Sequence, residues 1–252
     1  MRSKRKRREK FPDFTKRALD EPPPVNLATL ARTARSRLGV GNDLLLWQLV
    51  DSAFPTGGFA HSGGLEAAWQ HGEVRTRDEF AAFLEIALEQ AEHNALPLVL
   101  AAHAEPERLP EFDRLCDAFL TNHVANRASR TQGRAFLFAV ERVFKAGCAA
   151  NLPCAHFAPV FGAALRQLSI SAETAARLLL FSQLRSLIAA GVRLNIVGPL
   201  EGQAIQFRMA SSIETICEQS ASSTLDALAQ TAPLLEIWQG AQDRLYSRLF
   251  QS

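Results

Sequence analysis

The sequence predicts an all-α fold, a single-domain helical bundle of about ten helices. Apolar residues recur at intervals of three and four over most of the chain, which is the spacing of one face of a helix. Alternation of apolar and polar residues, the pattern of a half-buried strand, is almost absent. With 252 residues, 47% of them hydrophobic, the chain can bury roughly three quarters of its unfolded surface in one core.

Residues 1–41 are predicted to be a basic, disordered or frayed extension that precedes an all-α domain of residues 42–252. The first 20 residues hold nine Lys or Arg and three Asp or Glu, a charge of +6, which leaves −4 for the rest of a chain with a net charge of +2. Two interpretations of this extension stay open. It could tether the chain to nucleic acid or to an acidic partner. It could equally be a solvated arm, which the lack of aromatic residues in Met1–Lys10 favours.

The expected compartment is the cytoplasm. Residues 1–20 contain no apolar core of a secretory signal, and no apolar run reaches about 18 residues, the length that spans a membrane. The cysteines have no C-x-x-C spacing, so we expect free thiols in a reducing environment. They are Cys116, Cys148, Cys154 and Cys217.

The first predicted helix is Leu44–Val50, which Asn42-Asp43 can cap. A second helix follows Ser62, which can cap it in the same way. Pro55 and the pair Gly57-Gly58 favour turns in the loop between these helices.

Phe54 and Phe59 lie on this loop, where large apolar residues are unexpected. They either pin the loop to the core or face a partner protein. These residues alone leave both interpretations open.

Thr76 and Glu79 have the spacing of a capping box, and a helix with one apolar face is predicted to follow. Its apolar residues are Phe80, Phe83, Leu84, Ala87, Leu88 and Ala91. Pro97 is expected to kink or split the continuation of this helix to Ala104.

Two further helices are predicted, one from Phe112 and one through Phe136–Phe144, which Gly147 can end. Gly133 lies where a helix would prefer Ala. This glycine indicates close approach by a neighbouring helix or by a partner.

Ser171 can cap the most apolar helix, which includes Leu178–Ile188. Because this helix is apolar on more than one face, we place it at the centre of the bundle. Helices over Leu200–Cys217 and Ala232–Tyr246 complete the predicted fold.

Catalysis is the less favoured interpretation of Asp51, Ser52, His61 and Ser62. A serine nucleophile needs a base within reach and a group that orients the base, and the strand–turn–helix context of a G-x-S-x-G motif is missing. The Gly-rich loop also lacks the lysine of a G-x-x-x-x-G-K-[ST] phosphate loop. A small α-helical hydrolase and a helical nucleic-acid-binding protein led by the basic arm are kept as alternatives.

No tightly bound metal or cofactor is expected. The six histidines never pair as H-x-x-x-H, and Cys154 with His156 forms a lone C-x-H, whereas tight sites normally show ligands in recognisable clusters. Transient nickel contact stays open, because imidazole suits that ion.

Five ordered blocks of sequence resemble the urease accessory protein UreF family. They are D-S-A-F-P-T-G-G-F-A-H-S-G-G-L-E (51–66), N-R-A-S-R-T-Q-G-R (126–134), H-F-A-P-V-F-G-A (156–163), V-R-L-N-I-V-G-P-L-E-G-Q (192–203) and Y-S-R-L-F-Q-S (246–252). The resemblance covers roughly residues 42–252, and five blocks in order are more specific than any one of them. One departure is Phe59, where many members have Tyr, so any contact made by that hydroxyl is absent here.

The resemblance implies a non-enzymatic assembly factor for urease. Family members are all-α, usually dimeric proteins that bridge UreD (also called UreH) and the GTPase UreG. That complex acts on the urease apoprotein to insert the nickel centre, and the family is implicated in coupling GTP hydrolysis to nickel passage. The implied partners are therefore a UreD/UreH-type protein, a UreG-type GTPase, urease apoprotein and a second copy of this chain, with neither a membrane nor nucleic acid.

The predicted partner-binding residues fall into three groups, and none of them is a predicted catalytic residue or metal ligand. The loop group comprises Phe54, Pro55, Gly57, Gly58, Phe59, His61, Ser62 and Glu66. The middle and late segments contribute Arg130, Gly133, Arg193 and Gly198. The C-terminal tail contributes Tyr246, Arg248, Leu249, Phe250 and Ser252. For Arg193 a capping charge at a helix C-terminus is an equal alternative.

The tail has four large apolar residues among its last eight: Leu245, Tyr246, Leu249 and Phe250. This pattern predicts an amphipathic helix or hook that docks in a groove on another protein. The resemblance implies that the UreD-type partner supplies the groove. In the alternative, Leu249 and Phe250 fold back on the protein's own core.

Overall fold

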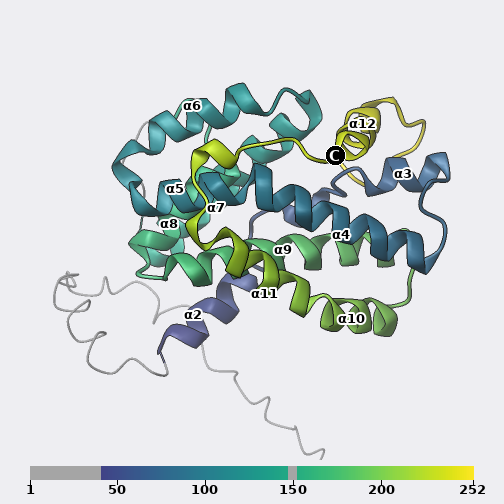
Figure 1. The fold of residues 1–252 in the computed structure, drawn as a ribbon, viewed down its shortest axis with the longest axis horizontal. Helices are drawn as coiled ribbons and strands as arrows, with labels where there is room; N and C mark the ends of the chain where they lie inside the picture. The colour runs from purple at the N-terminus through teal and green to yellow at the C-terminus, as the bar shows by residue number, and fades with distance from the viewer. Residues whose placement is uncertain (1–40, 147–151) are drawn as a thin grey trace, which may run out of the picture. The chain divides into compact units, whose positions relative to one another are not determined.

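The computed structural model describes residues 41–146 and 152–252 (Figure 1). These residues contain eleven α-helices, α2 to α12, and no β-strand, so the all-α prediction is confirmed. Residues Trp47–Ser252 form one compact unit, and of the unit Met1–Leu46 only the start of α2 is described. The predictions for residues 1–40, for Gly147 and for Cys148 lie outside the described residues.

Most of the helices lie where the sequence has an apolar face or a capping residue. Their bounds are α2 Gly41–Val50, α3 Leu65–His71, α4 Arg77–Asn94, α5 Leu96–Ala104, α6 Leu109–Phe119, α7 His123–Phe144, α8 Phe157–Gln167, α9 Ala172–Arg193, α10 Pro199–Arg208, α11 Ala210–Gln219 and α12 Pro233–Ala241.

Helix α4 begins at the predicted capping box. Thr76 Oγ1 accepts a hydrogen bond from the Glu79 amide at 3.2 Å, and the Glu79 carboxylate accepts from the Thr76 amide at 2.8 Å. Two backbone N–H groups that have no partner inside the helix are thereby satisfied. The predicted apolar face is buried. The helix ends before Ala95, and α5 begins at Leu96 with Pro97 in its first turn.

Helix α9 packs against α4, α5, α8, α10 and α11, as predicted for the central helix. Ser171 caps its N-terminus, as predicted, and the Ser171 side chain accepts from the Thr174 amide. Its length and composition would suffice to cross a membrane, but 56% of the apolar stretch is buried inside the bundle. A core helix has this combination of apolar composition and burial.

Close helix contacts hold α5, α7 and α8 together. A Cβ atom at Gly162 of α8 would overlap the main chain of Val99 in α5. A Cβ atom at Gly133 of α7 would overlap the carbonyl oxygen of Ala155, just before α8. The close approach predicted at Gly133 is therefore confirmed, and the neighbour is the protein's own chain.

Four local predictions are wrong. Helix α2 begins at Gly41, before the Asn42-Asp43 pair that was predicted to cap it. Leu200–Cys217 is two helices, α10 and α11, which are separated by a turn at Met209. The last helix ends at Ala241 and does not continue to Tyr246. A short 3-10 turn, Gln242–Arg244, follows it directly. Helix α3 begins at Leu65 after Gly64 rather than directly after Ser62.

Candidate protein-binding surface

The two phenylalanines of the loop between α2 and α3 have opposite environments. Phe54 is 8% exposed. Its ring stacks on Phe144, with centroids 5.9 Å apart, and meets Phe136 edge-on at 6.1 Å. Phe59 is 72% exposed. Phe54 therefore pins the loop to the core, and Phe59 is presented to solvent.

The loop changes direction at glycines with positive φ. Gly57 has φ of 73°, and Gly63 and Gly64 have φ of 61° and 91°. Residues with a Cβ atom resist this conformation. Gly57 precedes the 3-10 turn Gly58–Ala60, which brings Phe59 to the surface.

The C-terminal tail folds back onto this loop. The amide of Gln251 donates to the Ala60 carbonyl at 2.8 Å, and the amide of Ser62 donates to the main-chain oxygen of Ser252 at 2.5 Å. His61 Nδ1 lies 2.5 Å from Ser252 Oγ. Of the two forms predicted for the tail, the amphipathic helix is wrong, because residues 245–252 form bends without helix and bond to the loop.

Glu66 of α3 is the buried anchor of the tail. It is 1% exposed, and its carboxylate accepts from the amides of Leu249 at 2.6 Å and Phe250 at 3.2 Å. Gln242 Nε2 donates to the same carboxylate at 2.6 Å. Three donors compensate for the burial of the charged group.

Arg193, at the end of α9, joins the loop to the tail. Its guanidinium donates to the carbonyl oxygens of Phe59 at 2.7 Å and Leu249 at 3.2 Å. The guanidinium carbon also lies 4.1 Å from the centre of the Phe250 ring, within the range of a cation–π contact. Neither earlier interpretation of Arg193 included this bridging role.

Asp243 fixes the start of the tail. Its carboxylate pairs with both terminal nitrogens of Arg127, at 2.8 and 3.0 Å, and with Arg248 at 3.1 Å. Hydrogen bonds from Arg127 lower the pKa of the Asp243 carboxyl. Arg248 is thus directed at the protein's own carboxylate while its side chain stays partly exposed.

The tail exposes some apolar side chains and buries others. Tyr246 is fully exposed and Leu249 is 58% exposed, whereas Phe250 is 4% exposed. Phe250 therefore packs inside this protein, as the fold-back alternative expected, and Leu249 does not. We call Phe59, Tyr246, Arg248 and Leu249, the exposed residues held by these contacts, the loop–tail surface.

The structure brings the loop group, the tail group and Arg193 together. Glu66, Ser62 and Ser252 are buried, so in this conformation they support the surface rather than face a partner, and Pro55 is exposed. Arg130, on α7, lines a separate open groove with Arg127 and Arg134. Gly133 is buried against the main chain of Ala155. Gly198 precedes Pro199 of α10, which lines a pocket together with Arg193.

Gln242 and Asp243 also support the tail, although their sequence context did not predict this role. Gln242 is fully buried and donates to Glu66 and to the Phe250 carbonyl. Both residues follow the last apolar turn of α12, where polar side chains look like ordinary surface residues. The only available signal was their position, three and two residues before Leu245, the first apolar residue of the tail.

The His61–Ser252 pair resembles half of a catalytic triad but lacks the acid. Within the described residues, His61 Nε2 is buried and has no hydrogen-bond partner, so nothing orients the ring for proton transfer. Burial, together with the charge of Arg127, lowers the pKa of His61. The ring is therefore a neutral structural group in this arrangement.

Comparisons with known proteins relate this chain to accessory proteins of urease. The model of the UreF family matches residues 74–210. Urease accessory protein F of Arabidopsis thaliana is 38% identical over 218 residues, covering 82% of this chain and 91% of the relative. The protein of the same name from Oryza sativa subsp. indica is 35% identical, covering 81% of this chain and 83% of the relative. Urease accessory protein UreF of Rhizobium leguminosarum bv. viciae is 29% identical, covering 83% of this chain and 96% of the relative. The chain belongs to the UreF family of urease accessory proteins.

Proposed function

We propose that this chain acts in urease maturation as a non-catalytic assembly factor that bridges a UreD/UreH-type protein and a UreG-type GTPase. The family and the names of the relatives support a role as a urease accessory protein. The bridging role and the insertion of nickel into urease apoprotein are finer proposals, which rest on the family resemblance. Nickel is the cargo of this process, contacted transiently and not held as a resident cofactor, and the reaction belongs in the cytoplasm.

The observation that supports a docking role best is the construction of the loop–tail surface. Tyr246, Leu249 and Phe59 expose large apolar groups. Arg193 and Glu66 hold the main chain of Phe59 and Leu249, and Gln70 Nε2 donates to the carbonyl oxygen of Ser247, next to Tyr246. A surface fixed in this way loses little conformational entropy when a partner binds. Aromatic residues on a rigid support are typical of interface hot spots.

We assign the loop–tail surface to the UreD/UreH-type partner. Arg248 is partly neutralised by Asp243, so a partner groove for this surface needs apolar pockets more than acidic ones. Phe59 contributes its ring at the edge of the same surface. A tyrosine hydroxyl at this position would lie among exposed atoms, so its loss removes a surface contact rather than a core contact.

The other predicted groups are left for other partners. Arg130 lies in an open groove of about 590 Å³, which polar and basic residues of α7 line together with Asp117, Leu120 and Thr121. Its three arginines suit an acidic face of the GTPase or of urease. Gly198 is exposed at the start of α10, where an added Cβ atom would meet nothing within 4 Å. A second copy of the chain is a further proposed partner.

The experiment that tests the assembly role is reconstitution of urease in cells that express the urease subunits with the UreD- and UreG-type proteins. Adding this chain should convert inactive, nickel-poor urease into active, nickel-loaded enzyme. A Ser52→Ala, His61→Ala double variant serves as the control for hydrolase activity. Full urease activity and nickel content without this chain would contradict the proposal.

A further inference from the structure

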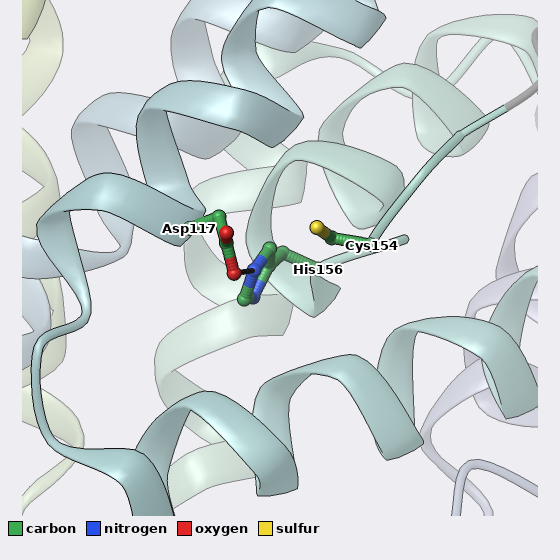
Figure 2. A group of neighbouring side chains, drawn as sticks. All are labelled: Asp117, Cys154 and His156. Carbon is green, nitrogen blue, oxygen red and sulfur yellow. Dashed lines mark hydrogen bonds and ion pairs between the residues drawn. The ribbon is translucent and has the colours of Figure 1, made fainter.

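Asp117, Cys154 and His156 converge outside the loop–tail surface (Figure 2). Asp117 comes from the last turn of α6, and the other two precede α8. One ligand atom from each side chain, a carboxylate oxygen, a thiol sulfur and an imidazole nitrogen, lies within 4.8 Å of the others. In the sequence, Cys154 and His156 form only a lone C-x-H, because Asp117 is far away along the chain.

The imidazole of His156 is oriented in the way that metal-binding histidines usually are. Its side chain is fully buried. Nδ1 lies 3.1 Å from Ser129 Oγ, which leaves Nε2 directed at the Asp117 carboxylate at 3.1 Å. A hydrogen bond on the far nitrogen is the arrangement that fixes tautomer and ring direction at metal sites.

Hydrogen bonds also fix the main chain of residues 154–156 and the side chain of Asp117. Both carboxylate oxygens of Asp113, a fully buried residue, accept from the amides of Cys154, Ala155 and His156 at 3.0, 3.1 and 2.7 Å. Asn126 Nδ2 donates to Asp117 Oδ1 at 3.0 Å. The side chains around the three ligand atoms thus resemble the outer shell of a built site.

We propose that Asp117, Cys154 and His156 bind one divalent transition-metal ion. Thiolate, imidazole and carboxylate together suit Zn²⁺, Co²⁺ and Ni²⁺ rather than Mg²⁺ or Ca²⁺. Asp117 is 41% exposed and lines the open groove beside α7, so solvent can supply water as a fourth ligand. The site lies outside the loop–tail surface, and Asp117 lines the same groove that is proposed above for the GTPase or for urease.

The change in geometry that binding requires is small. Metal–ligand bonds of about 2.0–2.3 Å in a tetrahedron separate the ligand atoms by roughly 3.3–3.8 Å. The present separations, at most 4.8 Å, need to close by about 1 Å. The metal–sulfur bond replaces the S–H bond, and the proton passes to solvent.

The test uses the full chain in its reduced form and Co²⁺ as the probe. Titration should develop one equivalent of a thiolate-to-cobalt charge-transfer band, and added Zn²⁺ should remove it. Cys154→Ser should abolish the band, and Asp117→Asn should weaken Co²⁺ binding by about tenfold or more. The matched controls are Cys217→Ser and Cys148→Ser, which leave the three ligands intact and should bind normally.

Ser129→Ala adds an independent check, because it removes no ligand. Loss of the hydrogen bond to His156 Nδ1 should weaken Co²⁺ binding by about tenfold, in a variant whose circular dichroism and thermal midpoint show that it is folded. The proposal is overturned if no charge-transfer band appears with the wild-type chain. It is equally overturned if the band persists in folded Cys154→Ser, since the thiolate would then come from elsewhere.

Discussion

Arg193 and Phe250 form the contact that closes the loop–tail surface: the guanidinium carbon lies 4.1 Å from the centre of the ring. The same guanidinium donates to carbonyl oxygens of the loop and of the tail, at Phe59 and Leu249. One side chain at the end of the central helix α9 therefore connects two segments that are almost 200 residues apart in the chain. The contacts of Arg193 therefore fix the main chain that carries the exposed side chains of Phe59 and Leu249.

Replacing Arg193 by Lys tests this bridge. Lysine keeps the charge but cannot donate through a planar fork while stacking on a ring. We expect the free energy of unfolding to fall by about 1–2 kcal/mol, as measured by urea denaturation. Arg208→Lys on the exposed side of α10 is the control and should change little. Equal stability of the two variants would show that the bridge contributes nothing.

Glu66→Gln tests the buried anchor. The amide keeps the size of the side chain but replaces an acceptor by an NH₂ donor, which then faces the amides of Leu249 and Phe250 or Gln242. We expect a loss of about 1–3 kcal/mol in the free energy of unfolding, because a buried donor stays unsatisfied. Glu73→Gln, at an exposed position of the same region, is the control. A fully stable Glu66→Gln chain would mean that the tail does not depend on the carboxylate.

Gly133→Ala and Gly198→Ala should behave oppositely. At Gly133 the added methyl would overlap the carbonyl oxygen of Ala155, whereas at Gly198 it would meet open space at φ of −77°. We expect Gly133→Ala to lower stability by about 1–3 kcal/mol and Gly198→Ala to change it by less than about 1 kcal/mol. Thermal unfolding of both variants measures the difference. Equal midpoints would contradict the close approach of α7 and the segment before α8.

The sequence predicted the helices where local signals and burial agree. The capping box at Thr76 and the six apolar positions that follow it define α4 in both the sequence and the structure. Gly133 was a signal of close approach that the fold then explains. Helix ends such as Met209 were missed, because a break without Gly or Pro leaves no mark in an apolar pattern.

The site was predicted only in its parts. Glycine and apolar residues identified the loop and the tail, but no local pattern could reveal that Gln251 bonds to Ala60 or that Arg193 bridges them. The tail looked helical because Tyr246, Leu249 and Phe250 have helical spacing. Hydrogen bonds to Glu66 outweigh that preference, because they satisfy a buried charge.

The lowered pKa of His61 predicts a change of stability with pH. Burial and the nearby Arg127 charge lower this pKa below its ordinary value of 6.5 in the folded chain. As the pH falls below 6.5, the unfolded chain therefore binds a proton that the folded chain does not, and the free energy of unfolding decreases until the folded pKa is reached. Above pH 6.5 the contribution is present in full.

The measurement is the free energy of unfolding from pH 8 to 5 for the wild type and for His61→Asn, in which the amide can keep a hydrogen bond to Ser252. The wild type should lose more stability than the variant as the pH falls through this range. His71→Asn, on the surface at the end of α3, is the control and should follow the wild type. Parallel curves for wild type and His61→Asn would show that His61 does not contribute to acid sensitivity.

The central claim is that Tyr246 and Leu249, held on a rigid backbone, dock the UreD/UreH-type partner. The most direct test is the dissociation constant of that partner for the wild type and for Tyr246→Ala, Leu249→Ala. The matched control is Phe138→Ala, Val143→Ala, which truncates two exposed apolar residues of α7. We predict that the tail variant binds about 30-fold or more weakly, equivalent to about 2 kcal/mol or more, with an unchanged thermal midpoint, and that the control binds like the wild type. Wild-type affinity in the tail variant would contradict the account.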